Sequence, residues 1–311
     1  MTFDIHAHLF HPKWYPRPFS DSLAEDYLKR SQASGRPQDP ARASETVFRM
    51  LSDDTGELTV RLMDKAEIEA KVILVLDWGV ELGEAHCSIE QVHKDTLAIC
   101  ARFPDRLIGF AGIDPRRASA VQIVEHAFDE LGARGLKLHP TGQWTLTEER
   151  TQRVVELAVR RKFPVLVHIG KTLDILNDQN AQPSALIKLA RFFPEGKFIA
   201  GHSGFELFEE FLAEPNLPPN IYFDISAWQP LLRNDRDVLL ARLTKLISAQ
   251  PTRVCFGSDS PFFTYNLAAS EKGWATFIAD FLKGLPNGLQ ESTAGVMHGQ
   301  DVFGSRALSK V

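Results

Sequence analysis

The sequence predicts an α/β protein, a (β/α)8 TIM barrel with a long insertion after its first strand. Short apolar runs alternate with amphipathic helical patterns along the chain, and eight such runs can be counted. The runs are apolar at successive positions, which is typical of parallel strands that are covered on both faces. A doubly wound open sheet is the alternative, but no GxGxxG motif follows any predicted strand.

The strands and helices are expected in regular alternation. The strands are predicted at residues 3–10, 71–77, 107–113, 135–139, 164–168, 197–202, 220–224 and 254–258. The helices are predicted at 58–70, 88–103, 118–131, 148–162, 183–193, 205–212, 237–249, 268–282 and 291–303. No linker or shift in composition divides the series, so residues 1–311 are predicted to form a single domain.

Residues 11–54 are expected to form an irregular insertion with one short helix at 22–33. The stretch is polar and contains five prolines, at positions 12, 16, 18, 37 and 40. A loop of this length in a compact domain is usually functional or disordered. Its aromatic residues Trp14, Tyr15 and Phe19 favour a packed lid over a disordered segment.

The composition is that of an ordinary globular protein, with 44% hydrophobic and 24% charged residues and a net charge of −5. No dense basic block indicates a nucleic acid or an anionic membrane as partner. No apolar run is long enough to span a bilayer, and no signal peptide is recognisable. Three cysteines without CxxC spacing indicate a reducing compartment, so we expect a cytoplasmic protein, with a homo-oligomer as the default state.

The predicted strands end in residues that bind metals or transfer protons. In a (β/α)8 barrel these ends meet at one face, where the active site lies. Five of the ten histidines lie there, although strand ends are a small part of the chain. The strand-end residues are His6, His8, Asp77, Trp78, Asp114, Lys137, His139, His168, His202, Asp224, Ser258 and Asp259.

Each of these residues has an ordinary structural explanation when it is taken alone. A single histidine at a strand end is commonly a hydrogen-bonded structural residue, and an Asp there often caps the next helix. Asp224 fits a helix cap and a hydrogen-bond acceptor for a histidine equally well. The remaining histidines are interpreted as surface or packing residues, namely His11, His86, His93, His126 and His298.

Taken together, four strand-end residues predict a metal site. His6 and His8 are two apart in one strand, so their side chains point to the same side. With His168 and Asp259 they offer three imidazoles and one carboxylate. This donor set suits zinc or a similar divalent ion and leaves room for a water molecule.

The ordered set of motifs resembles the amidohydrolase superfamily, and within it the branch that includes aminocarboxymuconate-semialdehyde decarboxylase. The matching stretches are residues 4–8, 135–140, 165–169, 199–203 and 256–261, with a closing segment at 296–304 in which Gln300 and Asp301 replace a usual Asn-Ala pair. The resemblance implies that His6, His8, His168 and Asp259 bind the metal. It also implies that Asp259 shuttles a proton and that His202 positions the attacking water.

The number of metal ions depends on Lys137. In two-metal relatives a lysine on the fourth strand is carboxylated and bridges the ions. Many members of the branch resembled here carry Lys-Leu-His-Pro, as this chain does, and are regarded as one-metal enzymes. We therefore expect one ion, with Lys137 and His139 binding the substrate or supporting the site.

The function expected from these parts is metal-dependent hydrolysis of a small amide, ester or lactone. Non-oxidative decarboxylation of an aromatic or unsaturated acid on the same site is the alternative. A non-catalytic binding barrel is the third hypothesis, and the complete ligand set argues against it. The residues expected around a small-molecule substrate are Lys137, His139, Trp14, Tyr15, Arg17, Trp78, Trp144 and Trp228.

Overall fold

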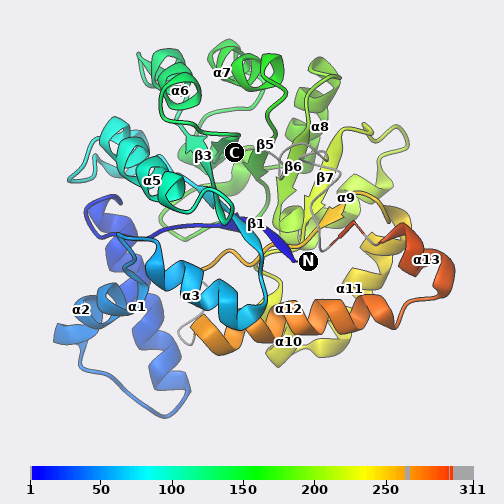
Figure 1. Ribbon diagram of the computed structural model, residues 1–311, viewed down its shortest axis with the longest axis horizontal. Coiled ribbons are helices and arrows are strands. Elements are labelled where there is room, and N and C mark those ends of the chain that lie inside the picture. The colour runs from blue at the N-terminus through cyan, green and yellow to red at the C-terminus, as the bar shows by residue number, and fades with distance from the viewer. Residues whose placement is uncertain (1, 263–266, 294, 297–311) are drawn as a thin grey trace.

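The computed structural model describes residues 2–262, 267–293 and 295–296 and contains one sheet of eight strands. The strands follow one another in chain order, and all neighbouring pairs from β1 to β8 are parallel (Figure 1). They are β1 (Phe3–Ala7), β2 (Ala70–Leu74), β3 (Leu107–Gly112), β4 (Leu136–Leu138), β5 (Val165–His168), β6 (Phe198–Gly201), β7 (Ile221–Asp224) and β8 (Val254–Cys255). The (β/α)8 barrel is confirmed.

Helices cover the outside of the sheet (Figure 1). They are α1 (Arg17–Ala33), α2 (Pro40–Leu51), α3 (Glu57–Ala66), α4 (Gly79–Leu82), α5 (Ile89–Arg102), α6 (Ala120–Asp129), α7 (Glu149–Arg160), α8 (Pro183–Phe192), α9 (Phe208–Ala213), α10 (Gln229–Asn234), α11 (Arg236–Ala249), α12 (Leu267–Lys283) and α13 (Asn287–Ser292). None of the helices in the described part of the chain is long and apolar enough to cross a membrane.

The first and last strands meet through backbone hydrogen bonds. The N–H of Asp259 donates to the carbonyl of His6 over 2.7 Å. The N–H of His8 donates to the carbonyl of Ser260, also over 2.7 Å. These bonds close the barrel and bring the motif at residues 4–8 beside the motif at residues 256–261.

A β-bulge interrupts the pairing of β1 with β2. The segment from Asp4 to Ala7 advances three residues while its partner, from Lys71 to Ile73, advances two. A bulge leaves one residue unpaired, bends the strand and changes which side chains face inward. The regular alternation expected over residues 3–10 therefore does not hold at this point.

The bulge directs His6 of β1 and His8, which directly follows β1, into the mouth of the barrel. Ile5 packs inside the barrel in a cluster with residues such as Leu166 of β5. Beyond the bulge, His6 and His8 both line a cavity at the strand ends. Asp4 does not share their side, because its carboxylate contacts the lysine at the second position of β2 instead.

The insertion is more regular than expected. Helices α1 and α2 occupy most of residues 11–54, so the prediction of an irregular stretch with one short helix is wrong. Pro16 is the N-cap of α1 and Pro40 is the first residue of α2. Proline is well tolerated in the first turn of a helix, because its missing N–H would have no partner there. Asp39 also caps α2 by accepting the N–H of Ala41.

Two other expectations need correction or lie outside the described residues. The helix expected at 58–70 ends at Ala66, because Glu67 adopts a left-handed conformation with φ 57°. The helix expected at 291–303 overlaps α13 only at Glu291 and Ser292, and residues 294 and 297–303 of it lie outside the described residues. The closing segment at 296–304 lies outside them except for Val296, as does His298. His93 is a packing residue: it is buried and its Nε2 accepts the N–H of Gly112 over 3.0 Å.

Candidate metal centre

The strand ends surround a cavity of about 470 Å³. Eight of the residues singled out from the sequence line it, namely His6, His8, Trp78, Lys137, His139, His168, His202 and Asp259. Helix α1 covers one side of the mouth with residues that include Phe19 and Leu23, and the loop 171–175 covers another. The barrel thus gathers residues from strands that are far apart in the chain.

Each of the three histidines predicted to bind metal has one ring nitrogen paired with an oxygen that can only accept. The Nδ1 of His6 lies 2.5 Å from Oδ2 of Asp224. The Nδ1 of His8 lies 2.9 Å from the carbonyl of Leu74, and the Nε2 of His168 lies 3.1 Å from that of Lys171. These nitrogens must carry the proton, so the other nitrogen of each ring presents a lone pair.

The free nitrogens of His6 and His8 face a carboxylate. Oδ1 of Asp259 lies 3.2 Å from Nε2 of His8 and 3.6 Å from Nε2 of His6. Lone pairs on neutral imidazoles and on a carboxylate repel one another unless a cation lies between them. Ligand atoms of these three buried residues lie within 4.8 Å of one another. Their chemistry therefore fits a divalent metal ion.

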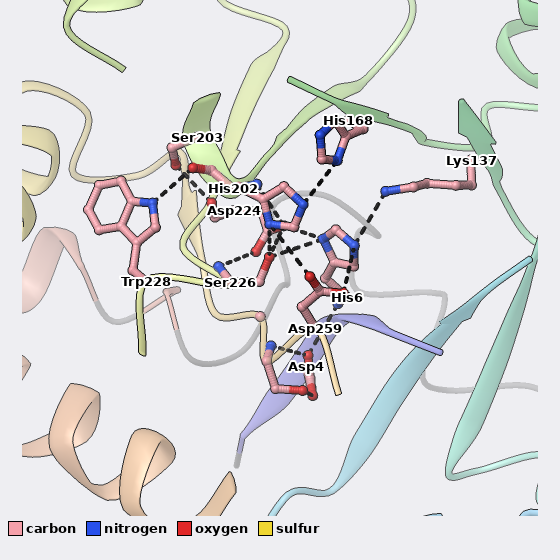
Figure 2. A network of polar contacts seen from close by, with 12 residues as sticks. Asp4, His6, Lys137, His168, His202, Ser203, Asp224, Ser226, Trp228 and Asp259 are labelled. Atoms are coloured by element: carbon pink, nitrogen blue, oxygen red, sulfur yellow. Dashed lines mark hydrogen bonds and ion pairs between the residues drawn. The ribbon is translucent and has the colours of Figure 1, made fainter. Parts of the chain in front are cut away.

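His168 stands apart from this compact group. Its free Nδ1 lies 3.2 Å from Nε2 of His202 rather than beside Asp259. The ring of His168 also stacks on that of His139, with centroids 4.0 Å apart and an interplanar angle of 16°. The structure thus brings three of the four predicted ligands together. The fourth, His168, lies next to His202, the histidine predicted to orient water (Figure 2).

Burial keeps four imidazoles of the site neutral by lowering their pKa. It lowers the pKa of His6, His139 and His202 well below the ordinary value and that of His168 to about 3. The neighbouring Lys137 ammonium acts in the same direction on all four rings. A neutral imidazole is the form that binds a metal.

Asp224 is the acceptor that fixes several groups of the site (Figure 2). Its Oδ2 accepts from Nδ1 of His6, from the N–H of His202 and from the hydroxyl of Ser226, at 2.5, 3.2 and 2.7 Å. Burial raises the pKa of Asp224 to about 6, so the carboxyl is still ionised at neutral pH. A Cβ at position 257 would lie 2.2 Å from its Oδ1, which explains the need for Gly257.

His202 is held by strained backbone after β6. It has φ 56°, and Ser203 and Phe205 also have positive φ. Such conformations are costly and are often found at active sites. The carbonyl of His202 accepts the indole N–H of Trp228 over 2.9 Å, and its Nδ1 lies 2.9 Å from Oγ of Ser226. These contacts orient the ring toward His168.

Lys137 lies in the same buried group as the histidines. Its Nζ is 3.3 Å from Nε2 of His6, on the side of the ring that carries the lone pair. Burial lowers the pKa of Lys137 to about 8, while the carboxylates of Asp259 and Asp224 oppose this shift. Lys137 therefore remains mostly protonated at neutral pH and provides a positive charge inside the cavity.

Several aromatic and charged residues expected around the substrate lie elsewhere. Arg17 is at the start of α1, outside the cavity lining, with 91% of its side chain exposed and an ion pair to Asp21. Trp14, Tyr15, Trp144 and Trp228 are buried packing residues that do not line the cavity. Composition could identify these residues as loop aromatics, but it could not determine the direction of their side chains.

A buried ionic network around Lys71, not predicted from the sequence, supports Asp259. Nζ of Lys71 donates to Oγ of Ser260 and to Oε1 of Glu271, both over 2.8 Å, and lies 3.4 Å from Oδ2 of Asp4. All these groups are buried. The sequence did contain a signal for this network, because Lys71 is a charged residue at the start of the apolar run predicted as the second strand.

The network fixes the residues on both sides of Asp259. Ser260 contacts Lys71, and the N–H of Ser258 donates to Asp4 over 2.9 Å. Asp259 itself has φ 51°, which is unfavourable for a residue with a side chain. We infer that these flanking contacts hold Asp259 in the orientation that faces His6 and His8.

A family model described as amidohydrolase matches residues 3–293 of the chain. The chain belongs to the amidohydrolase family. It is therefore an enzyme of that family, as its motifs implied. A search of the curated proteins found no match.

Solved structures with the same fold cover nearly the whole of this amidohydrolase. A 2,6-dihydroxybenzoate decarboxylase from Rhizobium is 16% identical, with 97% of this chain and 98% of that chain covered and a TM-score of 0.63. A 5-carboxyvanillate decarboxylase from Novosphingobium aromaticivorans, complexed with manganese, is 16% identical, with 97% and 96% covered and a TM-score of 0.63. A probable 2-pyrone-4,6-dicarboxylic acid hydrolase from Acinetobacter baumannii is 12% identical, with 97% and 99% covered and a TM-score of 0.60.

Replacing Asp224 in this amidohydrolase is expected to weaken metal binding. An Asp224→Asn variant loses the charged acceptor for His6, and such acceptors typically contribute about 10–100-fold to metal affinity. Competition with a chromophoric zinc chelator measures the effect. The matched control is Asp114→Asn, since Asp114 is a buried strand-end carboxylate whose partner is Arg116. Equal zinc affinity in the Asp224 variant and the wild type would show that this contact does not support a ligand.

Proposed function

We propose that this amidohydrolase uses one divalent metal ion to hydrolyse a small amide, ester or lactone. His6, His8 and Asp259 would hold the ion, with His168 as the candidate for a fourth position. The observation that carries the proposal is the pair of histidine lone pairs directed at the carboxylate of Asp259. Three nitrogen donors and one oxygen donor favour zinc over a harder ion, although manganese is present in one of the related structures.

The metal would supply a Lewis acid that polarises a carbonyl and acidifies water. Asp259 is placed to accept the proton of the attacking water and to return it to the leaving group. His202 is fixed by Trp228 and Ser226, so its Nε2 can orient that water. Lys137 can bind an anionic oxygen of the substrate as a point charge.

Decarboxylation on the same site is a second candidate function. The cavity walls are mostly apolar and include Phe19, Trp78, Phe205 and Phe262, which suits a flat substrate. Lys137 offers a cation for a carboxylate or phenolate in the same space. Two of the related structures are decarboxylases of substituted benzoic acids. In this reaction Asp259 would deliver a proton to the carbon that loses CO2.

Removal of the metal is expected to abolish turnover. Protein purified without chelators should contain one zinc or manganese ion per chain by elemental analysis, and dialysis against a chelator should remove both the ion and the activity. Addition of zinc, manganese or cobalt to the dialysed protein should restore activity, because the ligands remain in place. A chain that neither contains nor binds a divalent ion, and that is active without one, would contradict the proposal.

The two reactions are separated by their products. A panel of esters, lactones, amides and hydroxybenzoic acids is incubated with the metal-loaded enzyme, and the carboxylic acid product and CO2 release are recorded in parallel. Release of acid without CO2 supports hydrolysis, and CO2 with an equal amount of decarboxylated product supports the second candidate.

A further inference from the structure

Trp78 is presented to the cavity by a rigid segment. It follows β2 and Asp77, whose carboxylate accepts two bonds from Arg117 at 2.7 and 2.8 Å. The carbonyl of Trp78 accepts the N–H groups of Glu81 and Leu82 over 3.1 and 2.8 Å. The backbone at Trp78 is therefore held from both sides.

The indole ring is packed against Phe19 of helix α1 and against His139. Its centroid lies 4.8 Å from that of Phe19 on α1 and 4.9 Å from that of His139, with the His139 ring nearly perpendicular at 81°. The side chain is only 4% exposed, yet it lines the cavity together with Lys137. Two rings that line the cavity, those of Phe19 and His139, thus fix the position of the indole.

The indole N–H of Trp78 is buried and has no hydrogen-bond acceptor within the described part of the chain. The corresponding groups of Trp14, Trp228 and Trp274 donate to Asp95, to the carbonyl of His202 and to the carbonyl of Gly257. A buried donor without a partner is unfavourable, because it has lost its bond to water. Among the described residues that line the metal-site cavity, only Trp78 has a buried side-chain donor or acceptor without a hydrogen-bond partner.

We propose that Trp78 Nε1–H donates to an oxygen of the bound substrate and thereby determines specificity for flat molecules that carry a carboxylate, phenolate or carbonyl group. This proposal rests on the proposed function, because it takes the molecule bound in the cavity to be the substrate. The apolar walls accommodate the flat body of such a molecule, and Lys137 lies in the same cavity as a cation for an anionic oxygen. A site with a buried, unpaired donor discriminates strongly against analogues that lack the acceptor.

The proposal can be tested by NMR of the protein as isolated, labelled with 15N at the tryptophan side chains. The chain has five tryptophans, and the Trp78 signal is identified by its absence from a Trp78→Phe variant. Benzoate, 2-hydroxybenzoate and methyl benzoate are the probes, and toluene is the control without oxygen. The Trp78 indole proton should move downfield with at least one oxygen-bearing probe and not with toluene. The signals of Trp14, Trp144 and Trp274, outside the cavity lining, serve as internal references.

Affinity and kinetics provide the second measurement. Trp78→Phe keeps an aromatic ring and removes the donor, so it should weaken binding of the responsive probe by about 10-fold or more. With a substrate from the panel, KM should rise while the metal content stays at the wild-type value. The smaller ring also loses packing against Phe19 and His139, so the melting temperature is recorded to show that the variant is folded at the assay temperature. A comparison of benzoate with methyl benzoate shows whether the acceptor is anionic.

Three results would overturn the proposal. They are a Trp78 signal that does not move with any probe, a shift with toluene as large as that with the acids, and unchanged probe affinity in Trp78→Phe. Failure of the proposed function is recognised separately, by the absence of metal and of metal-dependent turnover. A Trp78 shift in a protein without metal would leave this proposal standing and remove only the catalytic assignment.

Discussion

An Asp259→Asn variant is expected to lose almost all turnover. Loss of proton transfer by Asp259 should by itself lower kcat by about 10²–10⁴-fold. The amide keeps the size of the side chain but cannot accept a proton. It also removes the negative charge that faces the lone pairs of His6 and His8. Metal affinity should therefore fall in the same variant. Steady-state kinetics with saturating zinc and elemental analysis measure the two effects separately.

The control for this variant is Asp174→Asn. Asp174 is an exposed carboxylate at the rim of the same cavity, on the loop 171–175. It belongs to neither of the close groups of potential ligands among the described residues, which are His6, His8 and Asp259 and His6, His202 and Asp224. Its variant should retain metal and most of the kcat. Full activity of Asp259→Asn at saturating metal would exclude Asp259 as the proton carrier.

A Lys71→Met variant is expected to lose about 3–5 kcal/mol of unfolding free energy at neutral pH, because removal of one partner leaves buried charges uncompensated. The carboxylates of Asp4 and Glu271 are both buried beside Lys71. Chemical denaturation of the metal-free protein measures the loss. For comparison, Arg160→Gln breaks the exposed ion pair between Arg160 and Glu156 on α7. It should lower the free energy of unfolding by less than about 1 kcal/mol.

The pH dependence of the Lys71→Met variant provides a check of the cause. Burial already raises the pKa of Asp4 to about 6 with Lys71 present, and loss of the cation raises it further. The folded variant then binds protons that the unfolded chain does not, so its stability deficit should be smaller at about pH 5.5 than at about pH 8. A double variant with Glu271→Gln should be less destabilised than Lys71→Met alone. A deficit independent of pH would indicate lost packing rather than unpaired charge.

The alternation of strands and helices and the residues at the strand ends were predictable from local sequence. Short apolar runs predict buried strands, and their number and regular alternation with helices favour a closed barrel. The insertion was predicted poorly. Its prolines were interpreted as helix breakers, whereas Pro16 and Pro40 lie where helices α1 and α2 begin. Proline has opposite effects at the start and in the middle of a helix, and the sequence does not give the starting position directly.

The side-chain directions at the site were less predictable. Alternation along the first strand places Asp4, His6 and His8 on one side, but the bulge separates Asp4 from the two histidines. Whether a strand contains a bulge depends on its register with the neighbouring strand, and the chain alone does not specify that register. Loop aromatics such as Trp14 were predicted near the substrate because the sequence does not give the direction of their side chains either.

The donor set of the proposed metal centre could be predicted from the amino-acid sequence alone, because imidazoles and a carboxylate at the ends of the first, fifth and eighth strands are donors that a divalent ion binds. Their orientation was decided by the tertiary structure. The acceptor that fixes His6 is Asp224, 218 residues away, and the one that fixes His8 is the carbonyl of Leu74, 66 residues away. A ring nitrogen becomes a donor or a ligand according to its hydrogen-bond partner, and such partners meet only when the barrel closes.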